Sequence, residues 1–231
     1  MKEIIRKRKS VRKFDMNPLD DAALEIVHEQ VKKLTPLHPD ISFSIEIAEK
    51  TKGMFNIKAP HYLVLCSEEK EGYLENIGFI GQQLDLFLSA NGIGACWVGA
   101  AKPTEKTLSA LPHVICIAIG RPDEPLYREI SGFKRKSLSE ISEGNDPRIE
   151  AARLAPSGLN AQNWYFIAGG DKIHCYIKKP NALVKPIIGK MGHIDLGIAI
   201  CHIAQESENF AFAKDMDAPT KKNLIYIGSI S

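Results

Sequence analysis

Short sequence patterns of the first half of the chain return in the same order in the second half, and this repetition constrains the fold more than any other feature. A basic tract at 7–11 (KRKSV) is matched at 134–138 (KRKSL). Three further pairs match: the strand-like 61–65 and 172–177, the apolar helical 76–88 and 195–207, and the strand-like 117–120 and 225–228. Each match alone is weak, but four in order predict an internal duplication. We therefore expect a single domain over 1–231 whose halves, about 1–128 and 129–231, pack about a pseudo-twofold axis.

Hydrophobic patterning predicts the main elements of the first half. Apolar residues at helical spacing predict a helix over about 19–35. The apolar segments 61–66 and 114–120 are typical of buried strands. The segment 73–92 is a helix that is apolar on nearly every side, so we expect it inside the domain. A polar stretch over 121–147 follows the second strand.

Overall composition excludes several classes of protein. The 231 residues are 44% apolar and 25% charged with a net charge of +2, which does not favour a dedicated nucleic-acid binder. No apolar run reaches the roughly 18–20 residues of a membrane span, and the N-terminus lacks a signal-peptide pattern. We expect a cytoplasmic protein without membrane association.

The five cysteines stand far apart, mostly inside apolar runs. This placement predicts buried free thiols rather than a disulfide framework. Their spacing relative to histidine does not match that of zinc-binding loops, so we expect no metal site.

Two basic clusters are the first candidates for a functional site. Arginines and lysines crowd around Ser10 over 6–13, and the cluster 134–136 precedes a second serine. Cationic side chains beside a serine hydroxyl form a phosphate-binding set, so two converging clusters would make a phosphate site. The alternative is a solvated basic face that contacts RNA or DNA.

The glycine-rich segment 92–100 (GIGACWVGA) is a second candidate. It is not a dinucleotide loop, because Trp97 holds the third-glycine place and the segment follows a helix instead of a strand. Gly99 and Ala100 are placed to offer backbone N–H groups to a flat ligand. The alternative is a tight helix-to-strand connection with Trp97 in the core.

The segment 151–166 (AARLAPSGLNAQNWYF) combines a helix stop with small polar side chains. Pro156 ends a helical run, since the residue before proline avoids helical geometry. The stop does not explain the polar groups that follow it, and the aromatic run beginning at Trp164 is expected to enter the core.

Motifs for acid, base or nucleophilic catalysis are missing. The sequence has no H-E-x-x-H, no G-x-S-x-G, no P-loop and no obvious Cys–His pair. Phosphate and planar-ligand sites without such residues favour chemistry carried by a cofactor, and no side chain is assigned a catalytic role.

Four segments together resemble the FMN-dependent nitroreductase family. RKSVRKF (8–14) is similar to the family's Arg-Arg-Ser-x-Arg-x-Phe start, and APSGLNAQNW (155–164) to its Ala-Pro-Ser-x-x-Asn-x-Gln-Pro-Trp segment. NGIGACWVGA (91–100) resembles its Gly-x-Gly-x-x-Trp-x-Gly pattern, and the segments 117–125 and 134–141 resemble its closing strand and basic tail. Lys9 and Asn163 depart from the family's second arginine and its proline.

The order of these segments is that of an internally duplicated branch of the family. Ordinary members carry the Pro-Ser-x-x-Asn segment soon after the start, whereas here it follows the basic tail. The resemblance implies a three-layer α/β/α fold of α+β class with largely antiparallel central sheets, in which one chain looks like a compressed homodimer. It also implies one FMN per chain, because only one complete set of segments is present. We expect a monomer, with a homodimer as the alternative.

The resemblance further implies which residues bind FMN. The first basic tract would hold the phosphate, the ribityl chain and the flavin edge, and the second cluster would complete the phosphate site. Backbone amides of the glycine-rich segment would lie near the flavin N5, and the second half would contribute the Pro-Ser-Gly segment across the pseudo-twofold. The implied cofactor-binding residues are Arg8, Lys9, Ser10, Arg12, Gly99, Ala100, Lys134, Arg135, Lys136, Pro156, Ser157, Gly158 and Asn160.

The implied function is that of an oxidoreductase. NADH or NADPH would reduce FMN by hydride transfer to N5, and the flavin would pass electrons to a small-molecule acceptor such as a nitroaromatic or a quinone. Arg12 is the candidate for positive charge near the N1/O2 edge. One alternative is a non-catalytic flavin-binding or cofactor-free protein on the same fold. A nucleic-acid-binding protein is the other, but basic residues before serine in both halves favour phosphate capture.

Overall fold

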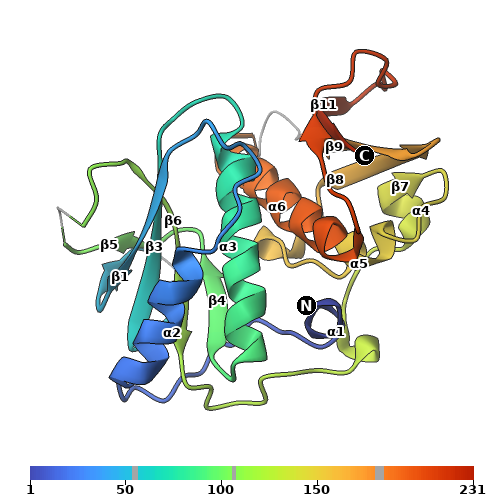
Figure 1. Ribbon diagram of the computed structural model, residues 1–231. Coiled ribbons are helices and arrows are strands. Elements are labelled where there is room, and N and C mark those ends of the chain that lie inside the picture. Colours follow the sequence, from blue (N-terminus) through green and yellow to red (C-terminus); the bar gives the residue numbers. More distant parts are fainter. Residues whose placement is uncertain (54–56, 106–107, 180–184) are drawn as a thin grey trace.

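Two long helices, α3 (Tyr73–Ala90) and α6 (Lys185–Glu206), cross at the centre of the computed structural model. The structure describes residues 1–53, 57–105, 108–179 and 185–231. Figure 1 shows the two helices between two groups of strands, one on either side. Helix α3 is buried over most of its length because it has neighbours on every side, as its uniformly apolar sequence predicts.

The first sheet has four antiparallel strands in the order β1-β3-β6-β4. The strands are β1 (Phe43–Ala48), β3 (His61–Ser67), β4 (Gly94–Val98) and β6 (His113–Gly120). Strand β3 is buried at every residue, which explains why its sequence is a continuous apolar run. A separate two-stranded sheet joins β2 (Thr51–Lys52) to β5 (Lys102–Pro103).

The second sheet has five strands in the order β10-β11-β9-β8-β7. The strands are β7 (Ser142–Glu143), β8 (Trp164–Gly169), β9 (Lys172–Lys178), β10 (Phe212–Ala213) and β11 (Leu224–Ile230). All neighbours are antiparallel except β7 and β8. Without β7, the order β8-β9-β11-β10 follows the same path as β1-β3-β6-β4, with a central helix after the second strand in each.

The shorter helices connect these layers. They are α1 (Lys2–Ile5), α2 (Asp21–Val31), α4 (Leu138–Ile141), α5 (Ile149–Arg153) and the 3-10 turns η1 (Ile130–Gly132) and η2 (Gly158–Asn160). Helix α2 begins after Asp20, whose carboxylate accepts a hydrogen bond from the Ala23 N–H. Ser137 and Glu140 cap the start of α4 reciprocally.

The central helices approach each other at two glycines. A Cβ atom on Gly78 would lie 2.1 Å from the carbonyl oxygen of Ile194, and a Cβ on Gly197 would lie 2.0 Å from that of Glu75. The contact is reciprocal, because each glycine faces the residue that stands three positions before the other glycine. A twofold relation between the helices would produce such an exchange. The duplication itself stays a prediction.

The mixed α+β class is confirmed, and the predicted strands and the helix over 73–92 are present. Two helix limits are corrected. Helix α2 ends at Val31 instead of near 35, because Pro36 disfavours helical geometry just before it. Helix α6 begins at Lys185, well before the predicted 195, because glycines in its first turns interrupt the apolar pattern.

Two further expectations concern the cysteines and the membrane. All five cysteines are buried free thiols, as predicted. In the part of the chain that the structure describes, no helix combines the length and apolar character needed to cross a membrane.

Candidate functional site

The first basic tract lies along strand β4, so two of the predicted segments are adjacent. The Val11 N–H donates to the Ala95 carbonyl at 3.0 Å, and a Cβ on Gly94 would lie 3.0 Å from the Val11 side chain. Burial raises the pKa of the Cys96 thiol, and the nearby charges of Arg12 and Arg8 oppose this rise. The structure therefore brings the tract 8–12 against the glycine-rich segment.

Arg8 lies inside the protein with no exposed surface. Its Nε is 3.3 Å from a carboxylate oxygen of Asp85 on α3, and its Nη2 donates to the Ser10 hydroxyl at 3.2 Å, while Nη1 has no hydrogen-bond partner in the described structure. Burial raises the pKa of Asp85, whereas Arg8 lowers it. Sequence analysis missed Asp85, although an acid inside an otherwise apolar helix was a signal for a buried partner.

Lys9 is already paired with a carboxylate. Its ammonium donates to Glu124 at 2.9 Å, and the same carboxylate accepts hydrogen bonds from the backbone N–H groups of Arg12 and Lys13. Burial opposes ionisation of Glu124, but these donors, led by the Arg12 N–H, lower its pKa to about 2. The Glu124 carboxylate thus takes up Lys9, which was predicted to bind the FMN phosphate, while the Arg12 side chain remains exposed.

Two guanidinium groups flank the ring of Phe133. The centre of the Arg128 guanidinium lies 3.9 Å from the ring centroid, and that of Arg135 lies 5.5 Å from it. Burial, followed by the charges of Arg8 and Arg12, lowers the pKa of Arg128 to about 10. Burial and the charges of Arg128, Arg8 and Arg153 also lower the pKa of Arg135 to about 10. These arginines form one cationic cluster, and sequence analysis missed Arg128 because it stands alone in a polar stretch.

The second basic tract holds the loop 156–162. Arg135 donates to the Asn160 side-chain oxygen at 2.8 Å, and the Asn160 amide donates to the Lys134 carbonyl at 2.9 Å. The Lys136 ammonium donates to the carbonyl of Ala161 at 2.7 Å, and the Lys136 N–H donates to the side chain of Gln162 at 2.8 Å. Two predicted segments from different parts of the second half therefore meet. The Lys134 side chain is exposed.

Three residues of this loop other than glycine adopt left-handed backbone conformations. Leu159, Asn160 and Gln162 have φ of 52°, 56° and 49°. Asparagine tolerates this region, but leucine is strained there. Leu159 is also 92% exposed, so neither packing nor backbone preference explains it. Such strain gathers at functional sites.

Asp195 on α6 holds the loop at Gly158. Its Oδ1 accepts a hydrogen bond from the Gly158 N–H at 2.9 Å, and its Oδ2 has no partner within the described structure. Burial raises the pKa of Asp195 to about 7, and the hydrogen bond from Gly158 counters this rise. Asp195 stands 37 positions from Gly158, and no local pattern predicts this contact.

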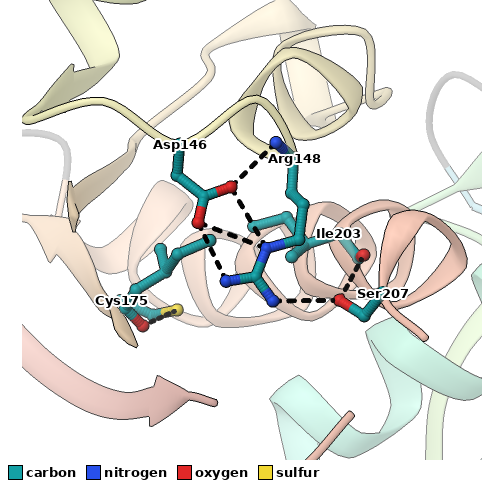
Figure 2. Close-up of polar contacts among 6 residues, drawn as sticks. Asp146, Arg148, Cys175, Ile203 and Ser207 are labelled. Carbon is teal, nitrogen blue, oxygen red and sulfur yellow. Dashed lines mark hydrogen bonds and ion pairs between the residues drawn. The ribbon is translucent and has the colours of Figure 1, made fainter. Parts of the chain in front are cut away.

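Helix α5, which leads into the loop, is fixed to the end of α6. Figure 2 shows that Arg148 forms a bidentate pair with Asp146 and donates to the Ser207 hydroxyl, which in turn donates to the Ile203 carbonyl. The loop is therefore held at its helical entry as well as at its centre. Pro156 is buried after the helix end, as the predicted stop requires.

The glycine-rich segment and the loop face each other across Met191 of α6. A Cβ on Gly99 would lie 2.4 Å from the Met191 Cε, and a Cβ on Gly158 would lie 2.6 Å from its Cγ. Trp97 is only half-buried and packs against Gly81. The predicted residues of both halves thus form one region, and Met191 stands between its two walls.

The chain matches one known protein family over most of its length. A family described as "Putative TM nitroreductase" matches residues 1–207 of the chain. The chain belongs to this nitroreductase family.

The chain is similar to several solved structures, and the first of them shares its fold. A "putative nitroreductase" from Thermotoga maritima is 22% identical, with a TM-score of 0.65 over 99% of this chain and 91% of that chain. An FMN-dependent nitroreductase from Clostridium difficile is 15% identical, with a TM-score of 0.47 over 63% of this chain and 100% of that chain. A nitroreductase family protein from Clostridium novyi is 18% identical, with a TM-score of 0.45 over 55% and 88%. No curated protein matches the chain.

Two surface hollows of the protein lie elsewhere. One of about 370 Å³ is lined by residues that include Lys172 and Asp215, and one of about 430 Å³ lies beside α2 and Phe87. Neither contains a residue of the predicted site. We place the candidate site at the converging segments, because the buried cationic cluster and the strained loop are there.

Proposed function

We propose that this protein is an FMN-dependent oxidoreductase that takes electrons from NADH or NADPH and reduces a small acceptor such as a nitroaromatic or a quinone. The observation that carries the proposal is the convergence of segments from both halves. Within the first half the tract 8–12 packs on the segment 94–100, and within the second half the cluster 134–136 holds the loop 156–162. The two halves approach each other at Met191, which lies against Gly99 and Gly158, and through the charge of Arg8 acting on Arg135. One chain would then supply both sides of one FMN site and work as a monomer.

The charges at the site fit the phosphate of FMN. Arg8 and Arg12 help to lower the pKa of Arg128, and Arg128 and Arg8 help to lower that of Arg135, so these guanidinium groups lie close together. Asp85 is the carboxylate that pairs with this cluster inside the described structure, and it is buried with Arg8. A phosphate dianion would balance the remaining charge, and the unpaired Nη1 of Arg8 and Nε of Arg135 are donors suited to it.

The backbone of the site fits a flat ring. Gly99 and Gly158 lack the Cβ atoms that would narrow the space between the two walls. Bound FMN supplies the hydride and electron chemistry. The protein would hold the phosphate with its arginines and Lys134, place the Gly99 and Ala100 backbone along one ring edge, and set the exposed Arg12 at another.

The contacts of Lys9 and Lys136 change their proposed roles. Lys9 is paired with Glu124 and Lys136 with the loop carbonyls. Both would act by positioning the tract and the loop around FMN. Ser10, Ser157 and Asn160 keep polar atoms at the two sides, although Asn160 also binds Arg135.

FMN titration of the purified protein tests this proposal, with flavin absorbance and fluorescence as the readout. Asn160→Gly keeps the left-handed backbone and removes the amide, so FMN affinity should fall by about tenfold, as for loss of one hydrogen bond to a charged or polar group. Asn223→Gly is the matched control, because Asn223 has a φ of 65° outside the site. It should leave affinity unchanged.

Three outcomes separate the functions. Oxidation of NADH or NADPH by the FMN-loaded protein with a nitroaromatic or quinone supports the oxidoreductase. A yellow protein that oxidises neither donor with any acceptor favours a flavin-binding protein without catalysis. A protein that ignores added FMN sinks the proposal.

A further inference from the structure

Met191 fills the space between the two walls of the proposed site. Its Cγ and Sδ lie against Gly158, at 2.6 and 3.1 Å from the Cβ that Gly158 lacks. Its terminal Cε lies against Gly99, at 2.4 Å from the corresponding missing Cβ. One extended thioether side chain therefore spans from the loop of the second half to the glycine-rich segment of the first.

The equivalent position in the first half, at the start of α3, is filled by other side chains. Asn76 accepts a hydrogen bond from the His38 N–H at 3.0 Å, as Asp195 accepts one from Gly158. The residue four positions before Asn76 is Gly72, whereas the residue four positions before Asp195 is Met191. In the first half the large side chain, His38, is on the loop and the glycine is at the helix. In the second half the glycine, Gly158, is in the loop and the large side chain, Met191, is on the helix.

Rigid rings close the first-half position. The His38 and Phe212 rings meet edge to face with centroids 5.7 Å apart, and a Cβ on Gly72 would lie 2.7 Å from the His38 Nε2. Phe212 in turn lies against Gly228, 2.4 Å from the Cβ that this residue lacks. A ligand ring could enter here only by moving two aromatic side chains. Met191, by contrast, is unbranched, has three rotatable bonds and is half-exposed.

We propose that Met191 is the gate of the FMN site: its thioether occupies the space that the flavin ring takes, and FMN binding turns it aside to pack on the ring. This inference rests on the proposed function. It assigns to Met191 a role in setting affinity and binding rate, and to the His38–Phe212 pair the closure of the other half, so that one chain binds one FMN.

The test compares FMN dissociation constants and association rates of the wild type and three variants, by flavin fluorescence and stopped flow. Met191→Ala removes the gate and should tighten binding or speed association by about fivefold or more. Met191→Phe should close the site as the His38–Phe212 pair does, and weaken binding by at least about tenfold. Met216→Ala is the matched control, because Met216 is 96% exposed and far from the site in its contacts.

Thermal unfolding keeps the comparison interpretable, since the half-exposed Met191→Ala variant should keep a cooperative transition near that of Met216→Ala. If FMN binds all four proteins alike, the gate is wrong and the proposed function stands. If FMN binds Met191→Ala more tightly or faster than the wild type, and Met191→Phe more weakly, the gate is supported and Met191 limits cofactor loading. If FMN binds none of them, both the gate and the proposed function are overturned.

Discussion

Arg8 and Arg135 stand at the same place in the two basic tracts, yet the protein uses them differently. Arg8 is fully buried and paired with Asp85 on α3. Arg135 is only partly buried and donates to the Asn160 side chain and to the Leu154 carbonyl. When the helical segments 76–88 and 195–207 are aligned, the position of Asp85 is taken by an alanine in the second half.

The two arginines therefore have different roles, one in stabilising the fold and one in the proposed ligand site. A buried ion pair with no exposed surface anchors the N-terminal tract to the central helix. A cation without a carboxylate, whose pKa burial lowers to about 10, remains available to an anionic ligand. In the first tract Arg8 is therefore an anchor that leaves only its Nη1 for a ligand, whereas Arg135 of the second tract has no carboxylate partner in the described structure.

The largest expected effect comes from breaking the anchor. Asp85→Asn leaves Arg8 buried without its counter-charge, and should lower the free energy of unfolding by about 3–5 kcal/mol. Chemical denaturation measures this loss. Glu143→Gln is the control, because Glu143 pairs with Lys221 at the surface and should contribute about 1 kcal/mol or less. A similarly small loss for Asp85→Asn would mean that Arg8 is held by its other contacts.

Acid should loosen the second half before the first. Gln83 and His202 are aligned, and each holds the chain that leads into its loop: Gln83 binds the Thr35 backbone, and the His202 Nδ1 donates to the Ala151 carbonyl at 2.9 Å. The second half alone uses a titratable group there. The His202 Nε2 then accepts from the Gln82 amide at 3.1 Å.

Burial lowers the pKa of His202 to about 3. The unfolded chain takes up a proton near pH 6.5 and the folded protein does not, so stability is full above that pH and falls as the pH drops toward 3. The loss should reach up to about 4 kcal/mol. Stability curves of the wild type and His202→Gln between pH 7 and 4.5 check this: the variant should show the shallower slope. Parallel curves would contradict a neutral His202.

The helix crossing tests whether the halves are equivalent. Gly78→Ala and Gly197→Ala each place a Cβ against the backbone of the other helix, so each should cost about 1–3 kcal/mol, and by similar amounts. The double variant should cost less than the sum, because the first substitution already separates the helices. Gly189→Ala on the same helix α6 has open space and should be neutral or slightly stabilising. Unequal costs at Gly78 and Gly197 would argue against a symmetric crossing.

Much of the fold was accessible from the sequence. Continuous apolar runs marked β3, β6 and α3, because elements buried on every side need no polar face. The start of α6 was missed, since Gly189 and Gly192 interrupt the apolar pattern in its first turns. The repeat of short motifs predicted an internal duplication, which stays a prediction, although the strand orders of the two sheets follow the same path.

The predicted site stays a prediction: its segments lie close together in the structure, but several of their partners were not predicted. Motifs named Arg8, Asn160 and the glycines, and the structure brings their segments together. The motifs do not identify Met191 and Asp195, which reach them through the crossing of α3 and α6. Asp85 and Glu124 can be seen as acids in the sequence, but their partners Arg8 and Lys9 cannot be deduced from it. Pairing across a tertiary contact leaves no local signal, which is why Lys9 was assigned to a phosphate when it binds Glu124.

The smallest expected effect concerns loop strain, where the halves differ most locally. If the loops are aligned on their shared Leu-x-Pro, the position of Leu159 is occupied in the first half by Pro39, whose ring prevents a positive φ. Leu159 has a φ of 52° and is almost fully exposed. Leu159→Gly removes the strain and should raise the free energy of unfolding by about 0.5–1 kcal/mol.

The same substitution shows what the strain is for. Leu159→Ala keeps the left-handed strain but removes the exposed apolar surface, so the two variants separate backbone from side chain. If the loop is strained to present its polar groups to FMN, Leu159→Gly should become more stable while its FMN affinity falls, and Leu159→Ala should keep its affinity. Loss of affinity in both variants would instead assign the contact to the leucine side chain. If Leu159→Gly is no more stable than the wild type, the left-handed conformation carries no strain, and the contrast with Pro39 reflects only which residues each loop tolerates.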